Sequence, residues 1–130
     1  MAFAGRGWVT AIHAMAAGVF DDVRVGPVAS RQPQNAARRA AQAGGEPARY
    51  EDLPGAADAV IVATPPPLHR REAERAVDGG ATVLVEAPLA ATLADADALV
   101  TESTSARLAY GENLVHSPVV AEAIGACRRL

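Results

Sequence analysis

The sequence predicts an α/β fold built on a doubly wound, mostly parallel sheet with helices on both faces. Short apolar runs alternate along the chain with alanine-rich segments of helical spacing. The apolar runs are continuous, which is typical of strands that are buried on both faces of a sheet. Strand and helix in alternation are typical of a parallel sheet, and the 130 residues are room for one such domain, residues 1–130.

The strands are expected at the continuous apolar runs: Ala2–Ala4, Val23–Ala29, Ala59–Ala63, Thr82–Val85 and Leu108–Tyr110. A short extended stretch, Ala48–Tyr50, is expected to add an edge strand. Gly26 and Pro27 fall inside a run that should form a central strand, where proline removes a ladder donor. We therefore expect either a bulge at Pro27 or a sheet that is weakened there.

The helices are expected at the segments of helical spacing: Val9–Ala17, Gln34–Ala43, Leu68–Val77, Leu93–Ser103 and Pro118–Arg129. Glycines follow the first three, as C-terminal caps do: Gly18, Gly44 with Gly45, and Gly79 with Gly80. Thr92 precedes the fourth helix, and Asp95 stands three residues later in a capping arrangement. Ser117 and Pro118 would supply an N-cap and a first-turn proline for the fifth.

Composition excludes several classes of function. The net charge is −3 with 21% charged residues, which argues against a nucleic-acid-binding arm and a polybasic membrane surface. No apolar run approaches the roughly 20 residues of a membrane span, and the N-terminus lacks a signal-peptide pattern. We therefore expect a cytoplasmic protein that binds neither nucleic acid nor membrane. Cys127 is the only cysteine, which excludes an internal disulfide, and all 12 basic residues are arginine, which excludes lysine chemistry.

A glycine-rich turn follows the first expected strand. The stretch Gly5–Thr10 reads G-x-G-x-x-T between a strand and a helix, the context of a dinucleotide-binding turn. Gly5 would make the tight turn, Gly7 would let the backbone approach a pyrophosphate, and the helix N-terminus would face its charge. Thr10 replaces the usual small third residue and would crowd helix against strand. An ordinary glycine turn is the alternative. The residues expected to contact the dinucleotide here are Gly5, Arg6, Gly7, Trp8 and Val9.

The second strand should end beside the adenosine ribose, roughly 20 residues after the glycine turn. An NAD site would carry Asp or Glu there, whereas this chain has Ser30 followed by Arg31. A hydroxyl and a guanidinium suit the 2′-phosphate of NADP, so we expect NADP as the cofactor. The alternative is a solvent-exposed arginine in a loop, and NAD stays open as the cofactor.

Three further motifs make the pattern specific: Ala63–His69 (Ala-Thr-Pro-Pro-Pro-Leu-His), Val85–Ala90 (Val-Glu-Ala-Pro-Leu-Ala) and Gly111–Pro118 (Gly-Glu-Asn-Leu-Val-His-Ser-Pro). Together with the glycine turn, they resemble the N-terminal domain of the glucose–fructose oxidoreductase/inositol dehydrogenase family (Gfo/Idh/MocA) over essentially the whole chain. The resemblance implies a Rossmann-like sheet of strand order 3-2-1-4-5-6 that binds NAD(P). It also implies a second α/β domain that binds a sugar or polyol.

The resemblance further implies contacts with the nicotinamide half of the cofactor. In the first motif these are Thr64, Pro65, Pro66, Leu68 and His69, in the second Glu86, Ala87 and Pro88, and in the third Asn113. The alternatives are a rigid proline loop without a ligand and, for His69, a surface capping residue. The glutamate would lie near the nicotinamide ribose, and the proline often follows a cis bond.

Ala87 is the most informative departure from the family pattern, which is usually Glu-Lys-Pro. The lysine contacts substrate or helps to move a proton, and general acid–base help of this kind contributes roughly 10²–10⁴-fold. Alanine supplies neither proton nor charge, so we assign no catalytic residue. The substrate domain of the family would begin after Leu130 and is expected to be missing.

Other candidate residues are set aside. His13 reads as a packing or surface residue on the first helix, and His116 as a structural residue. Arg70-Arg71 and Arg128-Arg129 read as charges on helix surfaces, and no Ser-His-Asp or metal-binding constellation is present.

The sequence therefore predicts an NADP(H)-binding domain of an oxidoreductase that moves a hydride to or from a sugar-like or polyol-like substrate. We expect it to be inactive by itself and expect a separate chain to carry the substrate domain. A non-catalytic nucleotide sensor or scaffold and a truncated gene product are the alternatives.

Overall fold

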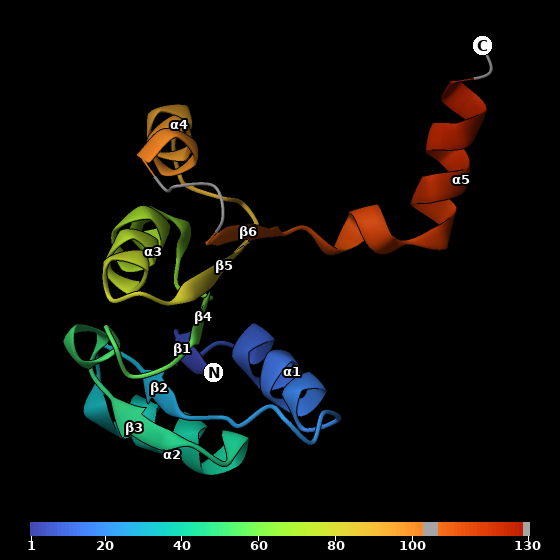
Figure 1. Ribbon diagram of the computed structural model, residues 1–130. Coiled ribbons are helices and arrows are strands. Elements are labelled where there is room, and N and C mark those ends of the chain that lie inside the picture. The colour runs from blue at the N-terminus through green and yellow to red at the C-terminus, as the bar shows by residue number, and fades with distance from the viewer. Residues whose placement is uncertain (103–106, 129–130) are drawn as a thin grey trace.

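The computed structural model describes residues 1–102 and 107–128. Within these residues six strands form one sheet, in which every neighbouring pair is parallel. The strands are β1 Ala2–Ala4, β2 Pro27–Ala29, β3 Glu46–Ala48, β4 Ala59–Val62, β5 Thr82–Glu86 and β6 Leu108–Gly111. Their order is β3-β2-β1-β4-β5-β6, which confirms the predicted Rossmann-like fold (Figure 1).

Five α-helices and three short 3₁₀ helices accompany the strands within the same described residues, and the last two of these helices follow β6. The α-helices are α1 Trp8–Ala17, α2 Pro33–Ala43, α3 His69–Asp78, α4 Leu93–Glu102 and α5 Pro118–Cys127. The 3₁₀ helices are η1 Tyr50–Asp52, η2 Pro66–Leu68 and η3 Asn113–His116. Ser103 and Arg129, the expected ends of two helices, lie outside the described residues. Of the expected surface pair Arg128-Arg129, only Arg128 is described. No helix among the described residues has the length and apolarity that crossing a membrane requires.

The sheet is buried on both faces, as its continuous apolar strands predict. Phe3 and Ile61 face one side, where they pack with Ala40 of α2 and Ala14 of α1. The strand residues that alternate with them, Ala2, Ala4, Val60 and Val62, face the other side and pack with Ala73 and Ala76 of α3 and Leu99 of α4. Side chains on adjacent strand positions therefore enter two separate cores.

Two expected strands differ from the structure by more than one residue at a boundary. The strand expected from Val23 begins at Pro27. Proline is tolerated as the first residue of a strand, so neither a bulge nor a weakened central strand results. The edge strand expected at Ala48–Tyr50 was wrong beyond Ala48, because Arg49 and Tyr50 turn into η1. The Arg49 backbone N–H donates to the Asp52 carboxylate over 3.1 Å, and the Asp52 backbone N–H donates to the Arg49 carbonyl over 3.2 Å.

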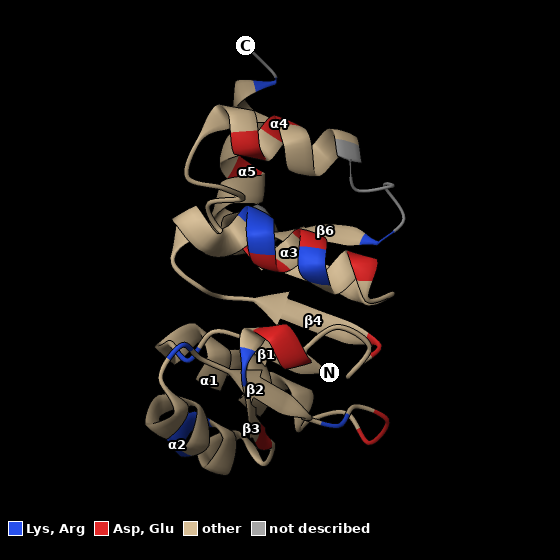
Figure 2. Cartoon of the chain, turned by 90° about the vertical axis from the view of Figure 1, so that its left-hand side faces the viewer, with Lys and Arg blue, Asp and Glu red and all other residues tan. Residues whose placement is uncertain are grey.

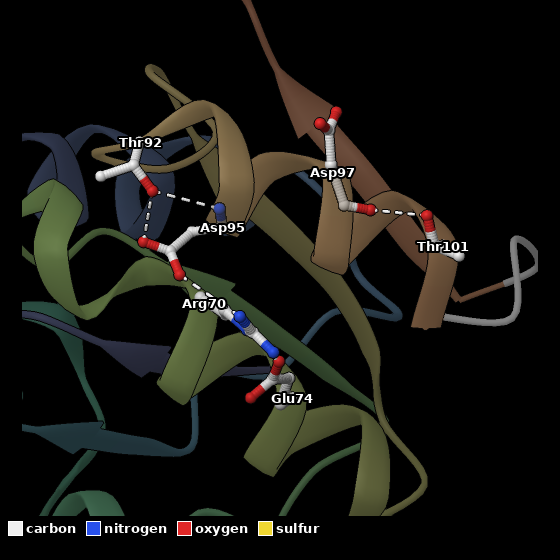
Figure 3. A network of polar contacts seen from close by, with 6 residues as sticks. All are labelled: Arg70, Glu74, Thr92, Asp95, Asp97 and Thr101. Carbon is white, nitrogen blue, oxygen red and sulfur yellow. Dashed lines mark hydrogen bonds and ion pairs between the residues drawn. The ribbon is translucent and has the colours of Figure 1, made fainter.

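The start of α4 carries the predicted cap and is tied to α3 (Figure 3). The Thr92 hydroxyl accepts from the Asp95 backbone N–H over 3.1 Å and donates to the Asp95 carboxylate over 2.7 Å. Arg70 of α3 donates to the same carboxylate over 3.3 Å and to Glu74 over 2.6 Å. The hydrogen bond from Thr92, followed by that from Arg70, lowers the pKa of Asp95 below its ordinary value.

This arrangement predicts a pH-dependent effect of Asp95→Asn. Because the pKa of Asp95 is lower in the folded chain than in the unfolded one, its stabilising effect is present above the unfolded pKa. The effect is lost as the pH falls through the folded pKa. We expect the variant to unfold at lower urea than wild type at about pH 7, and the difference to shrink toward about pH 3. Asp97→Asn is the control. In Figure 3, only the backbone carbonyl oxygen of Asp97 has a partner, the Thr101 hydroxyl, and its carboxylate has none. An unchanged difference at both pH values would contradict this prediction.

Candidate functional site

The glycine turn closes tightly against two strands. The Gly5 backbone has φ +128°, and its N–H donates to the Ala29 carbonyl over 3.1 Å. A Cβ at Gly5 would lie 2.3 Å from the Ala63 carbonyl oxygen, so no other residue fits this backbone without a shift. Thr10, expected to crowd helix against strand, is instead fully buried, and its hydroxyl donates to the Gly5 carbonyl over 3.2 Å. Thr10 thus holds the turn in place.

The N-terminus of α1 is open in front of this turn. Gly7 is the N-cap, with φ −64° and without a side-chain cap. A Cβ added at Gly7 would meet no described heavy atom within 4 Å. The backbone N–H groups of the first helical turn therefore face free space, which is the arrangement that binds a phosphate.

A groove of about 720 Å³ begins at this helix end. It is lined by Gly5, Arg6, Gly7, Trp8, Val9, Ser30, Arg31, Gln32, Tyr50, Ala63, Thr64 and Pro65. The structure thus brings together the predicted residues of the glycine turn, the end of β2 and the start of the proline loop. Sequence reasoning missed Gln32, Tyr50 and Ala63.

A second groove, of about 760 Å³, shares Ser30, Arg31 and Tyr50 with the first. It continues past the N-terminus of α2 toward β3 and η1, where Arg49 and Arg71 contribute to its lining. Sequence reasoning gave Arg71 no role beyond a helix surface. Because Ser30 and Arg31 line both grooves, they stand where the two grooves join.

The charges around this junction come from different elements. Arg71 pairs over 2.7 Å with Glu72, a buried carboxylate that Arg75 also contacts over 3.2 Å. Basic and acidic residues alternate along α3, as Figure 2 shows. Burial, and next the charge of Glu72, raise the pKa of Tyr50 above its ordinary value, against the opposing effect of nearby arginines. The Tyr50 phenol is therefore a neutral group in the wall shared by both grooves.

The groove fits a polar ligand at Thr64. The Thr64 side chain is 7% exposed, and its hydroxyl oxygen has no hydrogen-bond partner among the described residues. A buried hydroxyl without a partner costs free energy, so such groups usually meet a ligand or water. Thr64 lines the same groove as the open helix end, which is consistent with a bound dinucleotide.

Of the residues expected around the nicotinamide, Thr64 and Pro65 line the first groove. The others line neither groove: Pro66, Leu68, His69, Glu86, Ala87, Pro88 and Asn113. His69 is 1% exposed, so the alternative of a surface cap was wrong. Its Nε2 lies 2.7 Å from the Thr64 carbonyl oxygen, and its Nδ1 lies 2.9 Å from that of Pro88. The Ala87–Pro88 bond is cis.

His13 was set aside from the sequence, but its Nε2 lies 2.5 Å from Glu86 Oε1. No sequence signal pairs these two residues, which are 73 positions apart. Among the described residues, no group of three or more His, Cys, Asp or Glu side chains could hold a metal ion.

Comparison with known proteins agrees with this geometry. Residues 1–113 match the model of the Gfo/Idh/MocA family, described as an oxidoreductase family with the NAD-binding Rossmann fold. No curated protein matches the sequence.

Solved structures of similar fold are longer than this chain. UDP-N-acetylglucosamine 3-dehydrogenase from Acidithiobacillus ferrooxidans is 25% identical, with a TM-score of 0.82, over 96% of this chain and 40% of that one. An enzyme of gentamicin A biosynthesis, solved with NAD, is 28% identical, with a TM-score of 0.83, over 98% and 39%. A 3-ketoreductase variant from Actinomadura kijaniata, solved with TDP-benzene and NADP, is 26% identical, with a TM-score of 0.80, over 98% and 43%. The chain thus spans about 40% of the length of such relatives. It belongs to the Gfo/Idh/MocA oxidoreductase family and carries the NAD(P)-binding Rossmann domain of that family.

Proposed function

We propose that the chain binds NADP(H) in preference to NAD(H) and does not turn over a substrate by itself. The observation that carries the preference is the position of Ser30 and Arg31 where the two grooves join. A dinucleotide whose pyrophosphate faces α1 would present its adenosine ribose there. When bound, the reduced cofactor would donate a hydride to a carbon atom and the oxidised cofactor would accept one from it.

The charge at the junction favours a 2′-phosphate. Position 30 holds a serine, so it offers no carboxylate that would bind a free 2′-hydroxyl or repel a 2′-phosphate. The Ser30 hydroxyl oxygen accepts from the Gln32 backbone N–H over 3.4 Å, which leaves its own O–H free to donate. Arg31 offers a guanidinium for paired hydrogen bonds to phosphate oxygens. Arg49 and Arg71 line the adjoining groove, where Arg49 pairs with Glu51 over 3.4 Å and Arg71 with Glu72 over 2.7 Å.

The remaining groove residues would hold the rest of the dinucleotide. Gly5 and Gly7 let the phosphates approach the first turn of α1, and the buried Thr64 hydroxyl would gain a partner from the ligand. Val9 and Pro65 cover the wall of the groove with apolar surface. These contacts bind and orient the cofactor and perform no chemical step.

Two features support inactivity of this chain by itself. Ala87 stands where the family usually has a lysine, and the sequence contains no lysine that could replace it. Apart from Thr64 and Pro65, the residues expected on the nicotinamide side line neither groove, so a second surface would have to complete that side. We propose that a separate chain with a substrate domain supplies it, for a sugar-like or polyol-like substrate.

The exposed apolar side chains of the C-terminal part offer such a chain a surface. Leu114, Val119 and Ile124 are all exposed, and no residue of α5 is buried. Figure 1 shows α5 standing away from the sheet. A short helix without packed residues is marginal in water, so an added domain that covers α5 would stabilise it.

Titration of the purified chain with NADPH and NADH tests the cofactor preference. Trp8 is the only tryptophan, is 72% exposed and lines the groove, so its fluorescence should be quenched by bound cofactor. We expect saturable quenching that is about tenfold or more tighter for NADPH, the ratio typical of one charge-assisted contact. Arg31→Gln should remove this difference and leave NADH binding unchanged.

Arg24→Gln is the matched control, because it removes the same charge from an exposed residue before β2, outside both grooves. Tighter binding of NADH, or an unchanged preference in Arg31→Gln, would contradict the proposal for NADP. Robust oxidation of a sugar or polyol by the purified chain would contradict the proposed inactivity. The alternative of a non-catalytic sensor or scaffold predicts the same binding together with a stable partner that carries no substrate domain.

A further inference from the structure

The contact between His13 and Glu86 joins two elements that no local pattern links. His13 lies on α1, the helix whose N-terminus opens into the phosphate groove, and Glu86 is the last residue of β5. The His13 Nε2 lies 2.5 Å from Glu86 Oε1, a charge-assisted distance, and the two side chains are 25% and 22% exposed. The pair therefore sits at the carboxyl edge of the sheet, half-buried between helix and strand.

The fold does not depend on this contact. β5 is hydrogen-bonded to β4 on one side and to β6 on the other. α1 is anchored by buried Thr10 and Ala17 and by the packing of Ala14 against the core around Phe3. Partly exposed ion pairs add little to stability, so the main effect of the pair is to fix where the Glu86 carboxylate lies.

The carboxylate keeps one oxygen for a ligand. Oε1 is taken by His13, whereas Oε2 has no hydrogen-bond partner among the residues that the structure describes. On the other side, a Cβ at Gly111 would lie 3.6 Å from Oε1, so the carboxylate stands beside the end of β6. The next residue along the chain, Ala87, adds no polar group. A fixed carboxylate oxygen at the carboxyl edge of parallel strands suits a ligand hydroxyl group.

We propose that His13 is a positioning residue for the nicotinamide half of the cofactor. It holds Glu86 so that the second carboxylate oxygen accepts a hydrogen bond from a hydroxyl of the nicotinamide ribose. This inference rests on the proposed binding of NADP(H), and it assigns to α1 a part in both halves of the site. Its first turn faces the pyrophosphate, and its next turns fix the acceptor for the ribose.

The test compares NADPH with 2′,5′-ADP, which carries the 2′-phosphate and lacks the nicotinamide half. Calorimetric titration of wild type, His13→Leu, His13→Gln and Glu86→Gln gives both affinities for each protein. We expect His13→Leu to weaken NADPH about tenfold, as one lost charge-assisted hydrogen bond would, and to leave 2′,5′-ADP unchanged. His13→Gln should restore most of the loss, because its amide can donate to the carboxylate. Glu86→Gln should weaken NADPH as His13→Leu does.

His116→Gln is the matched control, because His116 is an exposed histidine of η3 outside both grooves. Equal weakening of both ligands by His13→Leu would show a structural role and overturn the inference, as would no weakening of either. Wild type that binds 2′,5′-ADP as tightly as NADPH would overturn it while leaving the proposed cofactor preference standing. Wild type that binds neither ligand would overturn the proposed function and this inference together. If His13→Leu does not fold, His13→Gln and Glu86→Gln still decide the outcome.

Discussion

Replacing Gly5 with alanine is expected to lower the free energy of unfolding by about 3 kcal/mol, a loss typical of backbone strain combined with a steric clash. The Gly5 backbone has φ +128°, a conformation that side chains rarely adopt. An added Cβ would lie 2.3 Å from the Ala63 carbonyl oxygen and 2.6 Å from its carbon. Both atoms belong to backbone at the end of β4, so no side-chain rotation relieves the clash. Urea unfolding followed by circular dichroism measures the loss.

Gly7→Ala separates stability from binding, because it adds the same methyl group two residues later. Gly7 has an ordinary φ of −64°, and its added Cβ would meet no described atom within 4 Å. We expect the free energy of unfolding to fall by less than about 1 kcal/mol, because alanine is a poorer N-cap than glycine but is not strained here. The methyl group would instead occupy the phosphate position, and affinity for NADPH should fall about a hundredfold, or about 2.7 kcal/mol. Wild-type stability in Gly5→Ala, or wild-type affinity in Gly7→Ala, would contradict this account of the turn.

The architecture could be predicted from the sequence because its signals are local. Continuous apolar runs such as Ala2–Ala4 and Thr82–Val85 mark buried parallel strands wherever they occur. Boundaries depend on tertiary contacts, and there the prediction failed. The run from Val23 contains the charged Arg24, and only its end, Pro27–Ala29, forms a strand between β1 and β3. The stretch after Ala48 bends away because the Asp52 side chain caps the backbone of Arg49.

The candidate site likewise has one part that sequence motifs predict and one part that they do not. The phosphate side follows from motifs in which the glycine turn and the Ser30-Arg31 pair each end a strand, and parallel strands bring such ends together. Tyr50, Arg71 and His13 enter the site from η1, α3 and α1, and their contacts depend on how the elements pack. A single histidine on an alanine-rich helix has no local feature that reveals a carboxylate 73 positions away. Such a pair is found only in the three-dimensional structure.

Replacing His69 with alanine is expected to lower the free energy of unfolding by about 3 kcal/mol, the sum of a cavity and a lost hydrogen bond from the buried ring. His69 is 1% exposed, and its two ring nitrogens contact the carbonyl oxygens of Thr64 and Pro88. These carbonyls belong to the loops that follow β4 and β5, so one side chain connects both. Alanine would remove the connection and leave the carbonyl oxygen that accepts from the ring N–H without that donor. Thermal and urea unfolding measure the loss, with the exposed His116→Ala as the control that should stay within about 0.5 kcal/mol of wild type.

His69→Leu distinguishes the hydrogen bonds from the space that the ring fills. Leucine replaces most of the buried volume but cannot donate the hydrogen bond of the ring, so it should recover the cavity part of the loss and leave a deficit of about 1–2 kcal/mol. The connection also sets the position of Thr64, whose unpartnered hydroxyl lines the phosphate groove. The folded fraction of His69→Leu should therefore bind NADPH more weakly than wild type, although His69 itself lines neither groove. If leucine restored full stability and full affinity, His69 would act as packing alone, and the two loops would hold their positions without it.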